Sequence, residues 1–337
     1  MWRATGQPFG VMASAMFRIL VLLMLAAPDT RPAADAADPA VYEALRAADA
    51  RLAAIGHRLA TANAPLCDRL QAGLGVVLHG IDQYPAAERP AARATFGFEG
   101  QVAVEAVVPD GPAAAAGVRA DDTLVAVDGE AVPDAGPRTA DRDAALLLIE
   151  RAAPAGRVAL TLRRGGATRT VAVPATPACR SRFELMLGDG FEAGSDGRIV
   201  HLGEKFLERF TDEEVAVVVA HELAHTILRH RERLDAARVN RGLLREVGRN
   251  GRLFRQTERE ADALAIALLH NAGYDAGAAG RFWRGRGGRL DGGLFRARTH
   301  PSARARADES DAVAAQLAGR PRPVVPAILA ARGQPLR

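Results

Sequence analysis

The sequence predicts an α+β protein with a mainly helical domain that contains a small β-sheet, and a β-rich domain inserted after an N-terminal helix. Apolar residues recur at helical spacing over residues 39–62, whereas residues 93–175 alternate between apolar and polar in the manner of β-strands. A second helical segment, residues 211–230, combines a helix start with an apolar run. With 337 residues, of which 48% are hydrophobic, the chain is long enough for about two domains with ordinary cores.

The first segment, residues 1–36, has the pattern of a secretory signal peptide. Arg18 precedes an apolar run within residues 16–27, and Pro28 and small residues follow up to Ala36. This run is shorter than the roughly 20 residues that a membrane-spanning helix requires, so an uncleaved N-terminal anchor is the weaker interpretation. We therefore expect export from a bacterial cytoplasm, most simply to the periplasm, and a mature chain without a stable membrane span.

Residues 37–80 follow as an N-terminal helical segment, which we expect to pack on the mainly helical domain. Five apolar residues at helical spacing predict an amphipathic helix over residues 39–62: Val41, Leu45, Leu52, Ile55 and Leu59. A short apolar stretch from Gly73 to His79 then predicts a strand.

Residues 93–175 form the β-rich domain, which ends in a predicted hairpin with a Gly165-Gly166 turn. The domain resembles a PDZ domain in FGFEG at 96–100, in VVPDGPAAAAGVRADDTLVAVDGEAV at 107–132 and in a predicted helix that follows. This resemblance implies recognition of a peptide or a protein C-terminal tail, which would add as a strand to the domain. The competing interpretation is a PDZ fold that serves only as a spacer.

The PDZ resemblance also implies a binding loop. In that family, the loop formed here by Phe96, Gly97 and Phe98 would offer backbone N–H groups to the carboxylate of the bound peptide. One position departs from the family pattern, because Asp121 stands where a glycine usually precedes Asp122.

The segment 211–230, TDEEVAVVVAHELAHTILRH, carries the strongest chemical signal in the chain. A capping box at Thr211 predicts the start of a helix, which an apolar run then buries. His221 and His225 are four positions apart, so they lie on one face of this helix, and Glu222 lies beside them. This His-Glu-x-x-His arrangement offers zinc two imidazoles, with a carboxylate that takes a proton from the attacking water. A helix with incidentally spaced histidines is the competing interpretation.

A third metal ligand is expected from a second predicted helix downstream. Glu258 would complete a His, His, Glu site, and Asp262 on the same helix face would orient one imidazole from behind. His230 points about 140° away from His225 on an ideal helix, which favours a supporting or a surface role for His230 rather than metal binding.

These motifs resemble a family of zinc peptidases that includes HtpX, the CAAX prenyl proteases and their periplasmic and mitochondrial relatives. HELAH at 221–225, EREAD at 258–262 and THPSARAR at 299–306 follow the order of that gluzincin family, and the resemblance covers roughly residues 180–320. It departs where family members usually have an Asn-Ala dipeptide on the strand that holds substrate, since this chain has Gly-Phe-Glu-Ala at 190–193.

The resemblance implies a zincin-type fold that binds one Zn²⁺ ion through three residues: His221, His225 and Glu258. It further implies that Glu222 is catalytic, that His300 lies in a loop over the active site and that Arg306 packs nearby. His300 would either stabilise the tetrahedral oxyanion or occupy the open zinc position and hold the enzyme latent. The last segment, residues 321–337, contains four prolines, and we expect it to be flexible.

The charge pattern favours no nucleic-acid partner. The formal net charge is only +4, and Lys205 is the only lysine, so the arginine excess reflects amino-acid usage more than partners. A denser arginine zone at 229–255 leaves a nucleic-acid patch as the weaker interpretation.

The two cysteines of the chain, Cys67 and Cys179, are expected to form a disulfide. One bridge is natural for an exported protein with two thiols, whereas two unrelated buried thiols would suit a reducing cytosol. The pair brackets the PDZ-like segment, so a bridge there would hold the ends of an inserted domain together.

The sequence as a whole predicts a secreted zinc metalloendopeptidase. We expect it to hydrolyse peptide bonds of unfolded or misassembled envelope proteins, with the PDZ domain recognising a substrate or a partner. The alternative is a non-catalytic PDZ adaptor or chaperone-like protein with a structural zinc site. The intact Glu222 argues against this alternative, because a site without catalysis has no need of that carboxylate.

Overall fold

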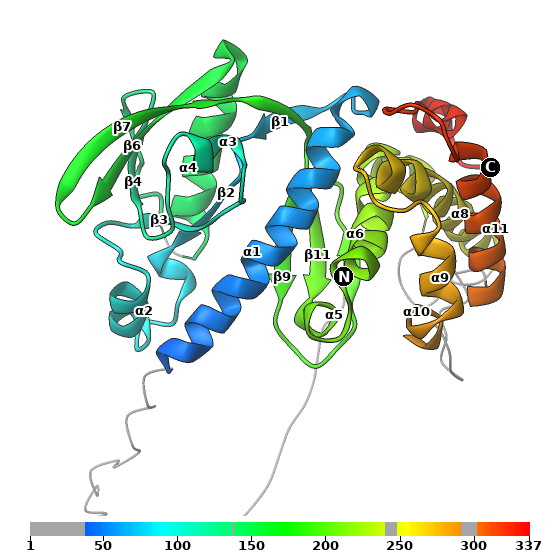
Figure 1. Ribbon diagram of the computed structural model, residues 1–337, viewed down its shortest axis with the longest axis horizontal. Helices are drawn as coiled ribbons and strands as arrows, with labels where there is room; N and C mark the ends of the chain where they lie inside the picture. The colour runs from blue at the N-terminus through cyan, green and yellow to red at the C-terminus, as the bar shows by residue number, and fades with distance from the viewer. Residues whose placement is uncertain (1–37, 137, 240–247, 291–301) are drawn as a thin grey trace, which may run out of the picture. The chain divides into compact units, whose positions relative to one another are not determined.

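The computed structural model of the chain describes residues 38–136, 138–239, 248–290 and 302–337 (Figure 1). These residues combine helices with three β-sheets, which agrees with the predicted mixture of helices and strands. None of the helices in the described ranges is long and apolar enough to cross a membrane. The predicted signal peptide, residues 1–36, lies outside the described residues.

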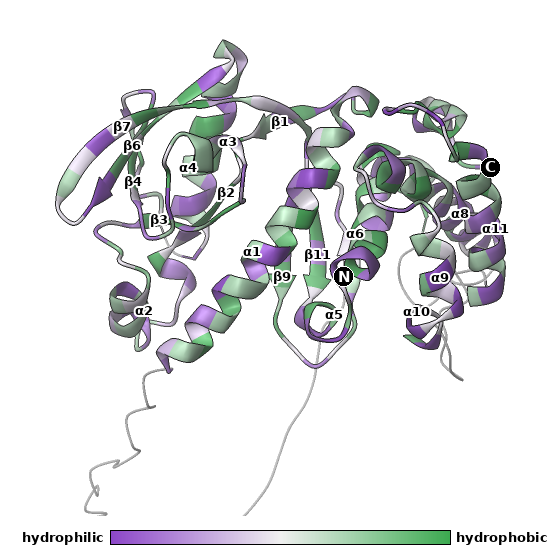
Figure 2. Ribbon diagram, in the orientation of Figure 1, coloured by the Kyte–Doolittle hydropathy of each residue, from purple (hydrophilic) through white to green (hydrophobic). Residues whose placement is uncertain are grey.

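The N-terminal helix α1 (Pro39–Ala62) has the predicted bounds. The Asp38 side chain accepts a hydrogen bond from the backbone N–H of Ala40 and so caps the helix, and Pro39 suits its first position. Figure 2 shows that hydrophilic and hydrophobic residues alternate along α1, as expected for a helix with one buried face. Several of its buried apolar residues, among them Leu52, Ile55 and Leu59, join the largest core cluster of the described chain.

The β-rich region is one sheet with strand order β2-β3-β4-β6-β7, in which β5 also pairs with β4 and every pairing is antiparallel. Its strands are β2 (Val76–Gly80), β3 (Val102–Val107), β4 (Thr123–Val127), β5 (Glu130–Ala131), β6 (Arg157–Arg164) and β7 (Ala167–Pro174). The helices and short turns of this region are η2 (Ile81–Gln83), α2 (Arg89–Thr95), α3 (Pro112–Ala115), α4 (Ala140–Ala152) and η3 (Ala153–Ala155). Leu148 and Ile149 of α4 pack into the core of this sheet.

The sheet begins earlier in the chain than the predicted boundary at residue 93. Strand β2, which we assigned to the N-terminal segment 37–80, pairs with β3 from Val76 opposite Val107 to Gly80 opposite Val102. The apolar stretch predicts that these residues form a strand, but it does not predict which strand, distant in the sequence, they pair with. Without β2, the backbone groups along that side of β3 would lack hydrogen-bond partners. The predicted turn at Gly165 and Gly166 does join β6 to β7, and both glycines have positive φ, which glycine adopts at little cost.

The second region contains a three-stranded sheet and most of the helices. Strand β11 (Ile199–Gly203) lies between β9 (Arg182–Met186), to which it is parallel, and β10 (Ala193–Ser195), to which it is antiparallel. The remaining helices are α5 (Glu204–Arg209), α6 (Asp212–Ile227), α7 (His230–Ala236), α8 (Gly248–Asn271), α9 (Ala278–Arg284), α10 (Arg286–Leu290) and α11 (Ala303–Leu317). Gly56 of α1 contacts the ring of Phe183 on β9 so closely that a Cβ atom would overlap the ring.

Part of the C-terminal segment 321–337, which we expect to be flexible, packs on the protein. It contains η4 (Ala327–Gly333), and the side chains of Val324 and Leu336 are buried. The side-chain amide of Asn271 on α8 donates to the carbonyl of Val324 and accepts from its N–H, and Arg233 donates to the carbonyl of Gln334. Prolines restrict the backbone of a segment, but they do not prevent it from packing when buried groups offer such partners.

The two ends of the β-rich region return to the same place. After η1 (Ala64–Leu66), strand β1 (Leu70–Gly73) pairs antiparallel with β8 (Thr176–Cys179). Cys67 and Cys179 lie at disulfide distance, with their Cα atoms 5.4 Å apart, as predicted. The region between them is therefore bracketed by a two-stranded ribbon and a cysteine pair.

Candidate metal centre

Helix α6 carries the His-Glu-x-x-His motif into the interior. Thr211 and Glu214 form the predicted capping box: Glu214 accepts from the backbone N–H of Thr211, and the Thr211 hydroxyl accepts from that of Glu214. Every residue from Val215 to Leu223 is buried, so the helix is anchored before and around its polar residues. Helix α8 packs along α6 and brings the predicted third ligand to the same place.

The three predicted metal ligands lie together. One ligand atom each of His221, His225 and Glu258 lies within 4.8 Å of the other two. His221 Nε2 is 3.1 Å from His225 Nε2 and 3.2 Å from a carboxylate oxygen of Glu258, which is 3.7 Å from His225 Nε2. Glu222 follows His221 on α6 and is only 9% exposed. The tertiary structure therefore gathers two nitrogens and one oxygen from two helices around one point.

Asp262 and Arg306 lie behind His221. His221 Nδ1 donates to Asp262 Oδ1 at 2.8 Å, which leaves Nε2 facing Glu258 and His225. Arg306 on α11 donates to both carboxylate oxygens of Asp262 and lies 3.4 Å over the ring of Trp283. Burial opposes ionisation of Asp262, but His221 and Arg306 outweigh it and lower the pKa of Asp262 to about 2.

His230 lies next to His225, a position that suits the supporting role predicted for it better than the surface role, although the helical-wheel argument directed the two rings apart. His230 Nδ1 is 2.9 Å from His225 Nδ1, and its Nε2 is 3.1 Å from Glu260. The argument assumed one continuous helix, but α6 ends at Ile227, and Arg229 has a left-handed φ of 54°. This turn brings His230, at the start of α7, back toward His225.

The field at the cluster favours a positive charge. Burial opposes protonation of His221, yet Asp262 and Glu258 outweigh it and raise the pKa of His221 to about 10. A divalent cation would supply that charge in place of a proton. Two imidazole nitrogens and one carboxylate oxygen are a donor set that zinc accepts, so the residues present fit a zinc ion.

Strand β10 lies beside α6. It is an edge strand of its sheet, and its Ser195 hydroxyl is 2.7 Å from that of Thr226, the residue after His225. The segment 190–193, which departs from the zinc-peptidase pattern, leads into this strand. The backbone carbonyl of Glu192, just before the strand, accepts from the backbone N–H of Gly203. Among the described strands, β10 pairs with β11 alone.

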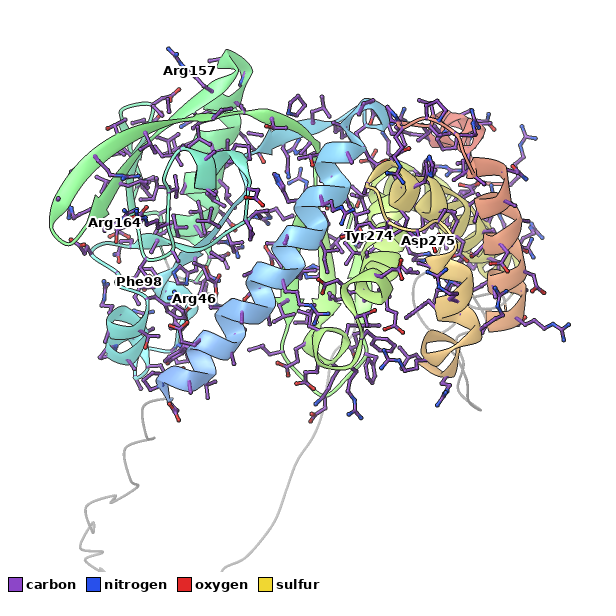
Figure 3. All side chains as sticks on the ribbon, in the orientation of Figure 1. Arg46, Phe98, Arg157, Arg164, Tyr274 and Asp275 are labelled. Atoms are coloured by element: carbon purple, nitrogen blue, oxygen red, sulfur yellow. A yellow bond between two sulfur atoms is a disulfide. The ribbon has the colours of Figure 1, made fainter. Side chains whose placement is uncertain are left out.

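The predicted PDZ loop is buried among aromatic side chains. Phe96 is 0% and Phe98 7% exposed, and both rings contact His79 and Tyr84. Arg46 of α1 lies 4.7 Å over the Phe96 ring, near Phe98 (Figure 3). These side chains pack the loop, while its role toward a peptide carboxylate stays a prediction. His300 lies outside the described residues, so its role stays a prediction as well.

Comparison with known proteins identifies one domain of the chain. A family model described as PDZ domain matches residues 103–164, which run from β3 to the end of β6. No curated protein sequence matches the chain. A PDZ domain is therefore present inside the predicted range 93–175, and it supports a role in recognising a substrate or a partner. The resemblance to zinc peptidases stays an interpretation of the motifs.

Proposed function

We propose that the protein is an exported zinc metalloendopeptidase with a PDZ domain. The observation that carries this proposal is the cluster of His221, His225 and Glu258, formed by two helices with Glu222 on the same helix as the histidines. A structural zinc site closes with four protein ligands, whereas a catalytic one has three and an open position. Among the described residues the set has three members, with the buried carboxylate of Glu222 on the same helix, and this is the arrangement that hydrolysis requires.

The residues divide the chemical work among them. His221, His225 and Glu258 hold the zinc ion, which when bound supplies a Lewis acid that polarises the peptide carbonyl and makes water more acidic. The Glu222 carboxylate accepts a proton from the attacking water and then delivers a proton to the nitrogen of the leaving amine. Asp262, held by Arg306, keeps the His221 ring in its place.

An extended peptide is the substrate class that suits this site. The edge of β10 can pair with a substrate backbone through main-chain hydrogen bonds, which depend little on side-chain sequence. Such pairing requires an unfolded segment. The cysteine pair is typical of an oxidising compartment, so we propose unfolded or misassembled envelope proteins as substrates, with the PDZ domain retaining them.

Digestion of a denatured protein tests this proposal. The full chain without residues 1–36 is purified, its metal content is measured by mass spectrometry, and casein is added with and without a chelator. We expect about one zinc per chain, fragments of casein, loss of cleavage with the chelator and recovery with added zinc. Zinc binding without cleavage would favour the adaptor alternative, and a chain that binds no zinc would exclude both zinc-dependent functions.

A further inference from the structure

A series of hydrogen-bonded polar side chains extends from the cluster of His221, His225 and Glu258 through His230. The residue His230 is 1% exposed, and its side chain lies between two groups, with Nδ1 2.9 Å from His225 Nδ1 and Nε2 3.1 Å from Glu260 Oε2. The rings of His225 and His230 meet edge to face, with centroids 4.8 Å apart. His230 therefore contacts the side of the His225 ring that faces away from Glu258 and His221.

Glu260 is itself held in place from three sides. Arg233 of α7 donates to both of its carboxylate oxygens, and the Gln256 side chain donates to Oε1 at 2.8 Å. The same Arg233 donates to the carbonyl of Gln334, which ties the group to the C-terminal segment. The three residues of this series, His230, Arg233 and Glu260, are each less than a tenth exposed. The Arg233–Glu260 pair is therefore a buried, hydrogen-bonded ion pair and not a solvated pair at the surface.

The contacts determine where the hydrogen atoms lie. An ionised Glu260 only accepts hydrogen bonds, so Nε2 of His230 donates to it. A neutral His230 then has a lone pair at Nδ1, which must accept from Nδ1–H of His225. His225 is thereby left with its lone pair at Nε2, the atom that faces His221 and Glu258. This is the tautomer in which His225 can bind a metal ion.

We propose that His230 is a positioning residue for the metal site, and that Glu260 with Arg233 orients it. The proposal rests on the proposed function, because it concerns the same zinc ligands. His225 would then be oriented through an intervening imidazole, as His221 is oriented directly by Asp262 with Arg306. Both supports share one pattern, an arginine that holds a carboxylate of α8. They differ in one respect: Asp262 contacts His221 directly, whereas His230 lies between Glu260 and His225.

Two substitutions of His230 separate positioning from packing. His230→Leu removes both contacts, whereas the amide oxygen of His230→Asn can occupy the place of Nδ1 and accept from His225 without reaching Glu260. In the full chain, zinc affinity is measured by competition with a chelator, and the cobalt form is examined by visible absorption. We expect the leucine variant to bind zinc about 10–100-fold more weakly than wild type and to change the cobalt spectrum, and the asparagine variant to recover most of the affinity.

A double-mutant cycle gives a second test that does not need the leucine variant to fold. Glu260→Gln should weaken zinc binding in the wild-type background, but it should add nothing to His230→Asn, because the asparagine no longer contacts residue 260. His270→Gln is the matched control. It removes another buried histidine of the same domain, one whose Nε2 lies near the carbonyl of Arg320, and it should leave zinc affinity unchanged.

The outcomes distinguish the inference from the proposed function. If wild type binds zinc and cleaves casein while His230→Leu and His230→Asn keep wild-type affinity and cobalt spectra, the positioning role is overturned and the proposed function stands. Additive losses in the double-mutant cycle would also overturn it. A wild-type chain that binds zinc without cleaving would contradict the proposed function, while the affinity comparisons would still decide the role of His230.

Discussion

At the residue scale, the two histidines of α6 differ in how they are supported. His221 donates directly to Asp262, whereas His225 faces His230, with Glu260 beyond it. Imidazole rings rotate readily about their side-chain torsions, so a ligand set needs such partners to keep both Nε2 atoms directed at one point. Loss of either partner should therefore affect metal binding without removing a ligand.

Glu222→Gln should retain zinc and lose peptidase activity. The amide fills the same volume in the buried site but cannot accept a proton from water, and general base catalysis contributes roughly 10²–10⁴-fold to a rate. Casein cleavage and zinc content are measured on the same preparation. A variant that keeps full zinc content and cleaves within about tenfold of the wild-type rate would exclude Glu222 as the base.

Glu258→Gln should instead release zinc. Glu258 supplies the only carboxylate of the three-residue set, and a neutral amide is a much weaker ligand for a cation. The loss of affinity should exceed the about 10–100-fold that follows removal of a partner behind a ligand. Chelator competition measures it, and Glu232→Gln, at an exposed glutamate that pairs with Arg69, serves as the control. Equal zinc affinity in wild type and Glu258→Gln would exclude Glu258 as a ligand.

At the scale of elements, α1 is shared between the two regions. Leu52, Ile55 and Leu59 belong to the core that contains α6 and α8, while Tyr42 joins the cluster around Phe96 at the β-rich sheet. Helix α1 also contacts β3. A helix placed in this way couples the packing of the PDZ domain to that of the region that contains α6 and α8, so a change at the interface should affect both.

The buried carboxyl group of Glu105 on β3 makes this interface sensitive to pH. Burial, with a contribution from Asp49, raises the pKa of Glu105 from 4.5 to about 8, although Arg46 and Arg142 oppose the shift. The folded protein thus binds this proton more tightly than the unfolded chain does. The stabilising contribution is complete below pH 4.5 and is lost as the pH rises through about 8.

Glu105→Gln should therefore be more stable than wild type in alkaline solution. The amide stays neutral, so the variant avoids a buried negative charge above about pH 8, whereas below about pH 4 the two proteins should melt at similar temperatures. Calorimetric melting temperatures across this range provide the measurement. Exposed Glu130→Gln is the control, and a constant difference between Glu105→Gln and wild type at all pH values would contradict the assignment.

At the scale of the whole molecule, the β1–β8 ribbon and the cysteine pair close the region that contains the PDZ domain. The bridge spans 112 positions, and closing so long a loop removes much conformational entropy from the unfolded chain. Reduction, or replacement of Cys67 and Cys179 by serine, should lower the free energy of unfolding by about 2–4 kcal/mol. Urea denaturation with and without a reducing agent measures the difference, and the double serine variant should not respond to the agent.

Alkylation of both thiols in oxidised, folded protein would refute the bridge.

The sequence by itself determined the features that depend on neighbouring residues. The bounds of α1, the capping box at Thr211 and the Gly165-Gly166 turn are local, because side chains within a few positions decide them. The PDZ domain was predictable from its motifs, and the cysteine pair from its place on either side of that domain. The choice of Glu258 as a third ligand came from its motif, and the structure brings this residue to the histidines.

Only the tertiary structure decided the features that depend on distant partners. Strand β2 joins β3 because an open strand edge needs backbone partners, which no local pattern in either strand specifies. The C-terminal segment packs because Asn271 offers it hydrogen bonds from another part of the chain. His230 reaches His225 because the helix ends two residues before Arg229 turns the chain, a break that helical periodicity cannot reveal. For β2 and the C-terminal segment the free energy comes from a contact across the fold, so the deciding residue lies outside the segment whose sequence is read. His230 is placed by the local turn and then held by Glu260 of α8.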